Sequence, residues 1–90
     1  MDLKTFYGGK STAERDDFAR RCDSTRGVLQ NIMYGLRPCN PELAVALERE
    51  SAGEVRRWDV RPHDWHRIWP ELIGITGAPA IPAEPQAQAA

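Results

Sequence analysis

Apolar residues recur at helical spacing along most of the chain, and each run begins or ends at a helix signal. In residues 2–8 they follow the order i, i+3, i+4, which is typical of a short amphipathic helix that the glycine pair at its end stops. A second helix is predicted from the capping box of Ser11 and Glu14 to about Cys22, because each side chain can satisfy the other residue's backbone amide. Its predicted buried stripe consists of Phe18, Ala19 and Cys22.

Two further helices follow the same logic. The third is predicted over about 26–34, with Thr25 as N-cap and Gly35 at the left-handed position after its end. The fourth is predicted over about 41–52, because an asparagine cap followed by proline is a strong start signal and Gly53 stops the run. The predicted buried residues are Val28, Leu29, Ile32 and Met33 in the third helix, and Leu43, Ala44 and Leu47 in the fourth, with Val45 as a further candidate there.

The pattern changes after Glu54. Val55, Trp58 and Val60 predict a short extended stretch, and residues 62–69 predict one more helical turn before Pro70. The last residues are rich in alanine, proline and glutamine, a composition typical of disorder. We therefore expect an all-α fold, a compact bundle of four to five short helices over residues 1–73, followed by a disordered tail over 74–90.

Composition narrows the class of protein. With 90 residues, 41% hydrophobic and 28% charged, the chain matches an ordinary soluble domain. No apolar run approaches the ~20 residues that cross a bilayer, and the N-terminus does not resemble a signal peptide, so we expect a cytoplasmic protein without a membrane partner. The net charge of −1 does not favour nucleic acid, but residues 1–37 hold seven Lys and Arg against five Asp and Glu.

The second and third predicted helices have the spacing of a helix-turn-helix. This motif needs a small residue in its first helix, a tight turn and apolar anchors in its second helix. Ala19 supplies the small residue, Asp23 falls at the turn, and Leu29 and Ile32 are the anchors. The turn position usually requires positive φ, which aspartate tolerates at some cost. Two ordinarily packed helices would show the same spacing, which leaves that alternative open.

With the anchors facing inward, the helical period predicts which residues of the third helix face outward. Arginine pairs with guanine, and glutamine or asparagine with adenine, in the major groove. The candidate base-reading residues are therefore Thr25, Arg26, Gln30 and Asn31. The candidate contacts to the DNA backbone are Lys10, Arg20, Arg21, Gly27, Tyr34 and Arg37. A solvated helix face remains the alternative for Gln30 and Asn31, as does packing for Tyr34.

The stretches FARRCDSTRGVLQNI, GLRPCNPELAVALERESAGEVRRWDVRP and HDWHRIWPEL resemble the YdaS-like, Cro-type regulators of phages and prophages. The resemblance covers about residues 1–73 and implies a Cro-like helical domain that acts as a dimer on operator DNA. Some members are described as antitoxins. The chain departs from the family pattern at Asp23, where glycine is usual, and at Thr25-Arg26, where Ser-Pro often opens the helix.

The remaining chemistry is sparse. Trp58, Trp65 and Trp69 are candidates for a dimer interface or for a cap on the small core. His63 and His66 lack further ligands nearby, and two cysteines do not make a disulfide framework, so we expect no metal, cofactor or catalytic site. The preferred hypothesis is a transcriptional repressor whose homodimer binds double-stranded operator DNA at half-sites one helical turn apart. The alternatives are an antitoxin-type interaction module that neutralises a toxin, and an activator.

Overall fold

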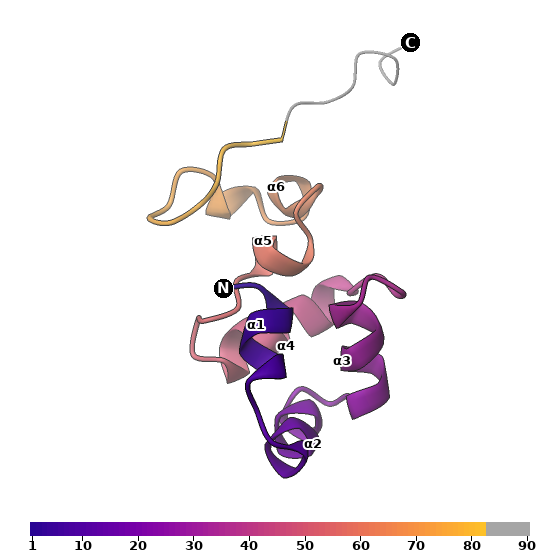
Figure 1. Cartoon of the computed structure of the whole chain (residues 1–90). Helices are drawn as coiled ribbons and strands as arrows, with labels where there is room; N and C mark the ends of the chain where they lie inside the picture. Colours follow the sequence, from indigo (N-terminus) through magenta and orange to yellow (C-terminus); the bar gives the residue numbers. More distant parts are fainter. Residues whose placement is uncertain (83–90) are drawn as a thin grey trace.

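The computed structural model describes residues 1–82, and all regular structure in this part of the chain is helical (Figure 1). It contains six α-helices, one more than the upper end of the prediction, and one short 3-10 helix. The elements are α1 (Leu3–Gly8), α2 (Thr12–Arg21), α3 (Arg26–Met33), α4 (Pro41–Glu50), α5 (Arg57–Val60), α6 (Trp65–Ile68) and η1 (Pro70–Leu72).

The first four helices lie where the sequence predicts them, because their caps form as expected. The Ser11 hydroxyl accepts from the Glu14 amide at 3.2 Å, and the Glu14 carboxylate accepts from the Ser11 amide at 2.9 Å. The Thr25 hydroxyl accepts from the Val28 amide at 3.2 Å. At the start of α4, the side chain of Asn40 accepts from the backbone of the third helical residue at 2.8 Å.

The ends of α2, α3 and α4 share one geometry. In each, the residue after the C-cap has positive φ: 58° at Asp23, 74° at Gly35 and 55° at Ala52. Its amide and the next amide bond back to carbonyls of the last turn, which is the Schellman arrangement. Because Ala52 takes this position, α4 ends at Glu50, two residues earlier than predicted.

The prediction of an extended stretch after Glu54 is wrong. Residues 57–60 form α5 instead, because the Asp59 carboxylate accepts from the Arg56 amide at 2.8 Å and so caps a helical turn. The Arg57 amide donates to a carboxylate oxygen of Glu48 at 3.1 Å. The spacing of the apolar residues reveals neither bond, because both are made by polar groups. The bond to Glu48 also joins residues of two different helices.

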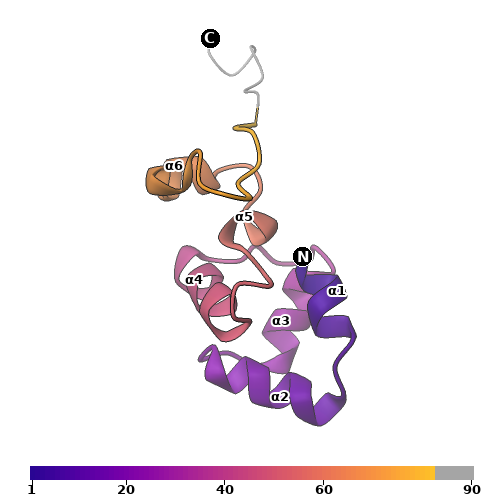
Figure 2. The same cartoon turned by 90° about the vertical axis from the view of Figure 1, so that its left-hand side faces the viewer.

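Two views at right angles show α1 to α4 grouped around one core, with α5, α6 and η1 on the side away from α2 (Figures 1 and 2). Phe18 lies fully buried in this core, with its ring centroid 5.2 Å from that of Phe6 and 6.2 Å from that of Tyr7. Arg61 connects the C-terminal part to the loop before α4 by donating to the Cys39 carbonyl and pairing with Asp64.

The apolar stripe of α3 is buried less deeply than the sequence predicts. Leu29 is completely buried, whereas Val28, Ile32 and Met33 are only partly buried and pack against the edge of the core. Leu43, Ala44 and Leu47 of the predicted α4 stripe are in the core, whereas the further candidate Val45 is exposed. The helix α3 therefore lies at the surface of the bundle, held mainly through one fully buried side chain.

The C-terminal prediction is met in part. The helical turn expected over 62–69 is shorter, since α6 spans only Trp65–Ile68. Residues 74–82 contain no helix, and the rest of the predicted disordered tail, 83–90, lies outside the described residues. Within residues 1–82, no helix combines the length and the apolar character needed to cross a membrane.

Candidate nucleic-acid interface

The α2–α3 pair is joined by a four-residue turn over residues 22–25. The Asp23 amide donates to the Arg20 carbonyl and the Ser24 amide to the Ala19 carbonyl, both at 2.9 Å. Ala19 and Leu29 have no exposed surface, so the small side chain and the first anchor predicted for the pair are both in the core. The positive φ expected at Asp23 is confirmed at 58°.

The four candidate base-reading residues are all exposed on α3 and its cap. The Thr25 hydroxyl is engaged in the helix cap. Gly27 is open to solvent, because a Cβ built there would meet only the Thr25 hydroxyl at 3.9 Å. The surface at Gly27 is therefore open, and a helix N-terminus of this kind favours approach by phosphate.

Arg26 has a neighbour that the sequence reasoning missed. Its guanidinium Nε lies 3.7 Å from a carboxylate oxygen of Asp16 in α2. Both side chains are about half exposed, so water screens this pair and its strength is modest. Because the contact is made through Nε, Arg26 can keep it while its two terminal nitrogens face a guanine edge.

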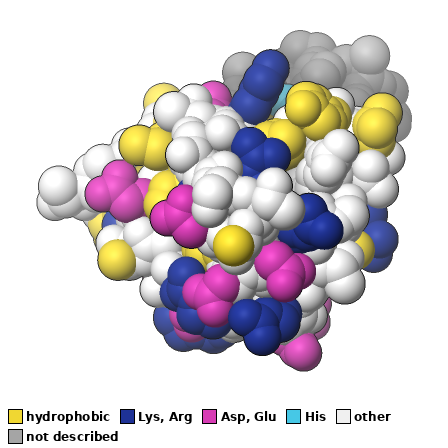
Figure 3. All heavy atoms as spheres, turned by 60° about the horizontal axis from the view of Figure 1, so that its bottom comes forward, with side chains coloured by type: hydrophobic (Ala, Val, Ile, Leu, Met, Phe, Trp, Pro, Cys, Tyr) yellow, Lys and Arg dark blue, Asp and Glu magenta, His cyan; other side chains and the backbone are white. Residues whose placement is uncertain are grey.

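The candidate phosphate contacts divide into two groups. Arg20 and Arg21 are already paired with carboxylates: Asp17 lies 3.4 Å from Arg20 and 3.1 Å from Arg21, and Glu50 lies 3.1 Å from Arg21. Figure 3 shows basic and acidic side chains interleaved on the face that lies at the bottom of Figure 1, where α2 is found. The pairing of Arg20 and Arg21 within α2 could have been predicted from the sequence, because acidic and basic residues three or four positions apart in a helix form such pairs.

Lys10 and Arg37 form the second group, because neither has a carboxylate partner among the ion pairs of residues 1–82. The Lys10 ammonium lies 4.5 Å from the centre of the Phe6 ring and 5.8 Å from that of Phe18. Arg37 is exposed in the loop after α3. These two cations are the ones among the candidates that the structure leaves available to an anionic ligand.

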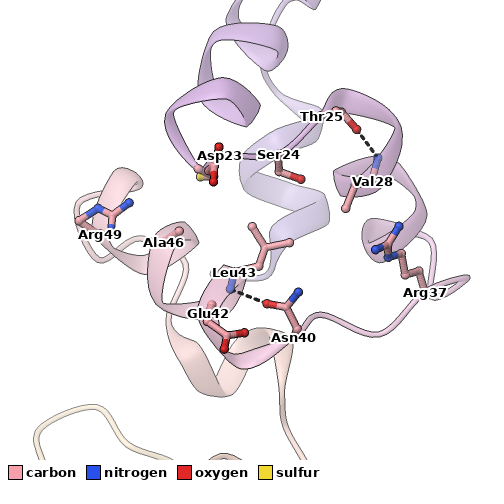
Figure 4. Close-up of a pocket in the computed structure, with 11 residues that line it drawn as sticks. Asp23, Ser24, Thr25, Val28, Arg37, Asn40, Glu42, Leu43, Ala46 and Arg49 are labelled. Atoms are coloured by element: carbon pink, nitrogen blue, oxygen red, sulfur yellow. Dashed lines mark hydrogen bonds between the residues drawn. The ribbon is translucent and has the colours of Figure 1, made fainter.

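A groove of about 570 Å³ runs between the start of α3 and α4 (Figure 4). Arg37 and Arg49 line it together with Asp23 and Glu42, so its charges are mixed and do not select one kind of ligand. The hydrogen bond that caps α4 at Asn40 crosses one side of the groove. The α3 surface therefore continues into α4 across a shallow, mixed-charge depression.

The tryptophans pack within the chain. Trp65 is completely buried, which corrects its assignment as an interface residue, and it is Trp69 that packs against the main core cluster, as a cap would. Its ring lies edge-on to that of Trp58, with centroids 5.7 Å apart. Trp58 and Trp69 are half-buried and covered by guanidinium groups, Arg56 over the first at 4.6 Å and Arg57 over the second at 5.2 Å.

The two thiols are unreactive parts of the core. Cys22 and Cys39 are both free and buried, and burial raises the pKa of each to about 11. A thiol with so high a pKa carries little thiolate near neutral pH, and thiolate is the nucleophile and the metal ligand. Within residues 1–82, no three His, Cys, Asp or Glu side chains are grouped so as to hold a metal ion.

No model of a known protein family matches this chain, and comparison with curated proteins gives no match. Its function is therefore inferred from its own residues.

Proposed function

We propose that the chain is a sequence-specific DNA-binding regulator in which α2 and α3 act as a helix-turn-helix and α3 enters the major groove. The observation that carries this proposal is the pairing of a buried Leu29 with an exposed polar face on the same short helix, behind a tight turn at Asp23. An arginine, a glutamine and an asparagine on that face are the side chains that distinguish base pairs in the major groove. Lys10 and Arg37 would hold the backbone on either side of them.

The regulator acts, in this proposal, as a homodimer. A two-fold symmetric protein places two copies of α3 one helical turn apart, so it requires an operator with matching two-fold symmetry. The resemblance to Cro-type phage and prophage regulators supports repression as the outcome. The tryptophans do not supply the dimer contact in this proposal, because Trp65 is buried and Trp58 and Trp69 are half-buried beneath arginines.

The first prediction concerns base reading. Selection of bound duplexes from a random DNA pool should give a palindromic consensus. Arg26→Ala and Gln30→Ala should each weaken binding to that consensus by ~1–3 kcal/mol, because each removes a bidentate base contact. Fluorescence anisotropy with the consensus and with a scrambled duplex measures both affinities, and the scrambled duplex should be affected much less by Gln30→Ala.

Two control variants sharpen the result. Arg37→Ala should weaken binding to both duplexes alike and reduce the slope of log K against log salt by about 0.9, as loss of one phosphate contact does. Arg67→Ala removes an equal charge from α6, on the side of the molecule away from α2, and should change neither affinity appreciably. Consensus affinity that survives both Arg26→Ala and Gln30→Ala would overturn the assignment of α3 as the reading helix.

A second candidate function is an antitoxin-type interaction module. Tyr34 and Leu36 favour it, because they lie two positions apart at the end of α3 and are 57% and 76% exposed. A contiguous patch of exposed apolar side chains is typical of a protein contact. A chain that co-purifies with the product of a neighbouring gene, and selects no duplex from a random pool, would favour this function over DNA binding.

A further inference from the structure

Ion pairs run without a break across the face that carries α2. Asp16 contacts both Arg26 of α3 and Arg20 of α2, at 3.7 Å and 4.0 Å. The chain of pairs continues through Asp17 to Arg21 and ends at Glu50 and Arg49 of α4. We call it the ion-pair chain, and in order its members are Arg26, Asp16, Arg20, Asp17, Arg21, Glu50 and Arg49.

The ion-pair chain reduces the positive charge that its arginines present to DNA. Four guanidinium groups are interleaved with three carboxylates, so most of the positive charge is neutralised within the protein itself. Sequence-independent DNA binding comes from cations that neutralise phosphates and release counterions. A phosphate that approaches Arg20 or Arg21 therefore competes with Asp17 for the guanidinium group.

The pairs are weak enough to be replaced. The side chain of Asp17 is 56% exposed, and those of Arg20 and Arg21 are 70% and 44% exposed. Exposed pairs of this kind are screened by water and salt, so a phosphate competes with the carboxylate on similar terms. The carboxylates lower the affinity for phosphate without abolishing it.

We propose that Asp16 and Asp17 are internal competitors of DNA phosphate, which hold down sequence-independent binding so that occupancy of DNA depends on the base contacts of α3. The inference rests on the proposed DNA-binding function and deepens it. Its consequence is weaker binding to the vast excess of nonspecific sites that a genome offers, where unpaired arginines would hold the protein more tightly.

The test uses Asp17→Asn, because the ion pairs of Asp17 join it to the two arginines of α2 and to no candidate base-reading residue. We expect the variant to bind a scrambled duplex and the selected consensus about two- to tenfold more tightly, as expected from the strength of exposed ion pairs. The slope of log K against log salt should steepen by about 0.9 for each additional phosphate that the variant neutralises. Fluorescence anisotropy over a salt series measures both quantities on the full chain.

Three further variants make the result specific. Glu71→Gln changes the net charge equally but lies in η1, far along the chain from α2, and should leave both affinities unchanged. Asp17→Glu keeps the carboxylate and should retain wild-type binding. Asp16→Asn should also tighten binding to the scrambled duplex, and it serves as the second test if circular dichroism shows that Asp17→Asn does not fold.

The outcomes separate the inference from the function on which it rests. If the wild-type chain binds the consensus but Asp17→Asn binds the scrambled duplex no more tightly than wild type, the inference is overturned. The DNA-binding function is then still supported. Equal tightening in Glu71→Gln overturns it as well, because bulk charge then explains the effect. Failure of wild type and variants to bind any duplex overturns both, and points instead to a protein partner for this face.

Discussion

Three successive helices, α2 to α4, are each followed by a left-handed residue that closes a Schellman motif. These residues are Asp23, Gly35 and Ala52. Glycine adopts this conformation without strain, whereas a Cβ meets the neighbouring carbonyl. Aspartate tolerates the region better than alanine does. Among these three positions, Ala52 is therefore the one where the sequence fits its own backbone least well.

Ala52→Gly should stabilise the chain by about 0.5–1 kcal/mol, because relief of left-handed strain exceeds the added entropy of the unfolded glycine. Ala13→Gly is the matched control, since Ala13 is exposed within α2 and has ordinary helical conformation. It should lose about 0.5–1 kcal/mol. Urea unfolding followed by circular dichroism measures both, and a destabilised Ala52→Gly would contradict the strain argument.

At the scale of the element, α2 combines stability with charge compensation. The Ser11–Glu14 capping box begins the helix, and acidic residues in its middle pair with arginines in its last turn. This order of charges also suits the helix dipole, whose negative end lies at the C-terminus. The pairs that support α2 are thus the same pairs that neutralise its arginines toward DNA.

The capping box makes the stability of α2 depend on pH. The backbone hydrogen bond from Ser11 lowers the pKa of Glu14 from its ordinary 4.5. The carboxylate therefore contributes stability that is fully present above about pH 4.5 and is lost as the pH falls through the lowered pKa. Glu14→Gln keeps an acceptor that does not titrate, so its free energy of unfolding should fall less than that of wild type between neutral pH and about pH 3.

A urea series at several pH values tests this prediction. Glu71→Gln serves as the control, because Glu71 is exposed and the helix η1 that carries it has no side-chain cap. Its loss of stability toward acid should follow that of wild type. Equal acid sensitivity in Glu14→Gln and wild type would show that the capping box does not couple α2 to pH.

On the scale of the whole molecule, Glu48 connects α4 to the C-terminal helices. Its carboxylate oxygens lie 3.2 Å from the guanidinium groups of Arg56 and Arg57, and one accepts from the Arg57 amide. The two guanidinium groups in turn cover Trp58 and Trp69. One carboxylate therefore orders the arginines that cover two tryptophans.

Glu48→Ala should destabilise the chain by about 1–3 kcal/mol, because it leaves a part-buried amide without its acceptor and two partly buried guanidinium groups without their carboxylate neighbour. Glu42→Ala, at an exposed position of the same helix, should stay within about 0.5 kcal/mol of wild type. Thermal or urea unfolding measures the difference. Equal stability of the two variants would mean that the contacts of Glu48 do not hold α5 and α6 in place.

Much of the fold follows from local signals. The caps at Ser11, Thr25 and Asn40 and the apolar stripes behind them predict α2 to α4, with errors of one or two residues at the ends. The exposed polar face of α3 also follows, because burial of Leu29 fixes the orientation of the whole helix. These features lie within a few residues of one another, so they are readable before any tertiary contact is known.

The sequence by itself thus determined the helical class, the boundaries of the main helices, the left-handed turn at Asp23 and the residues that α3 exposes. Only the tertiary structure decided that residues 57–60 are helical, that Trp65 lies in the core, and that Arg21 pairs with Glu50. The physical reason is distance along the chain. Helical periodicity and capping act over three or four residues, whereas the bonds from Arg57 to Glu48 and from Arg21 to Glu50 join residues 9 and 29 positions apart, and folding alone brings them together.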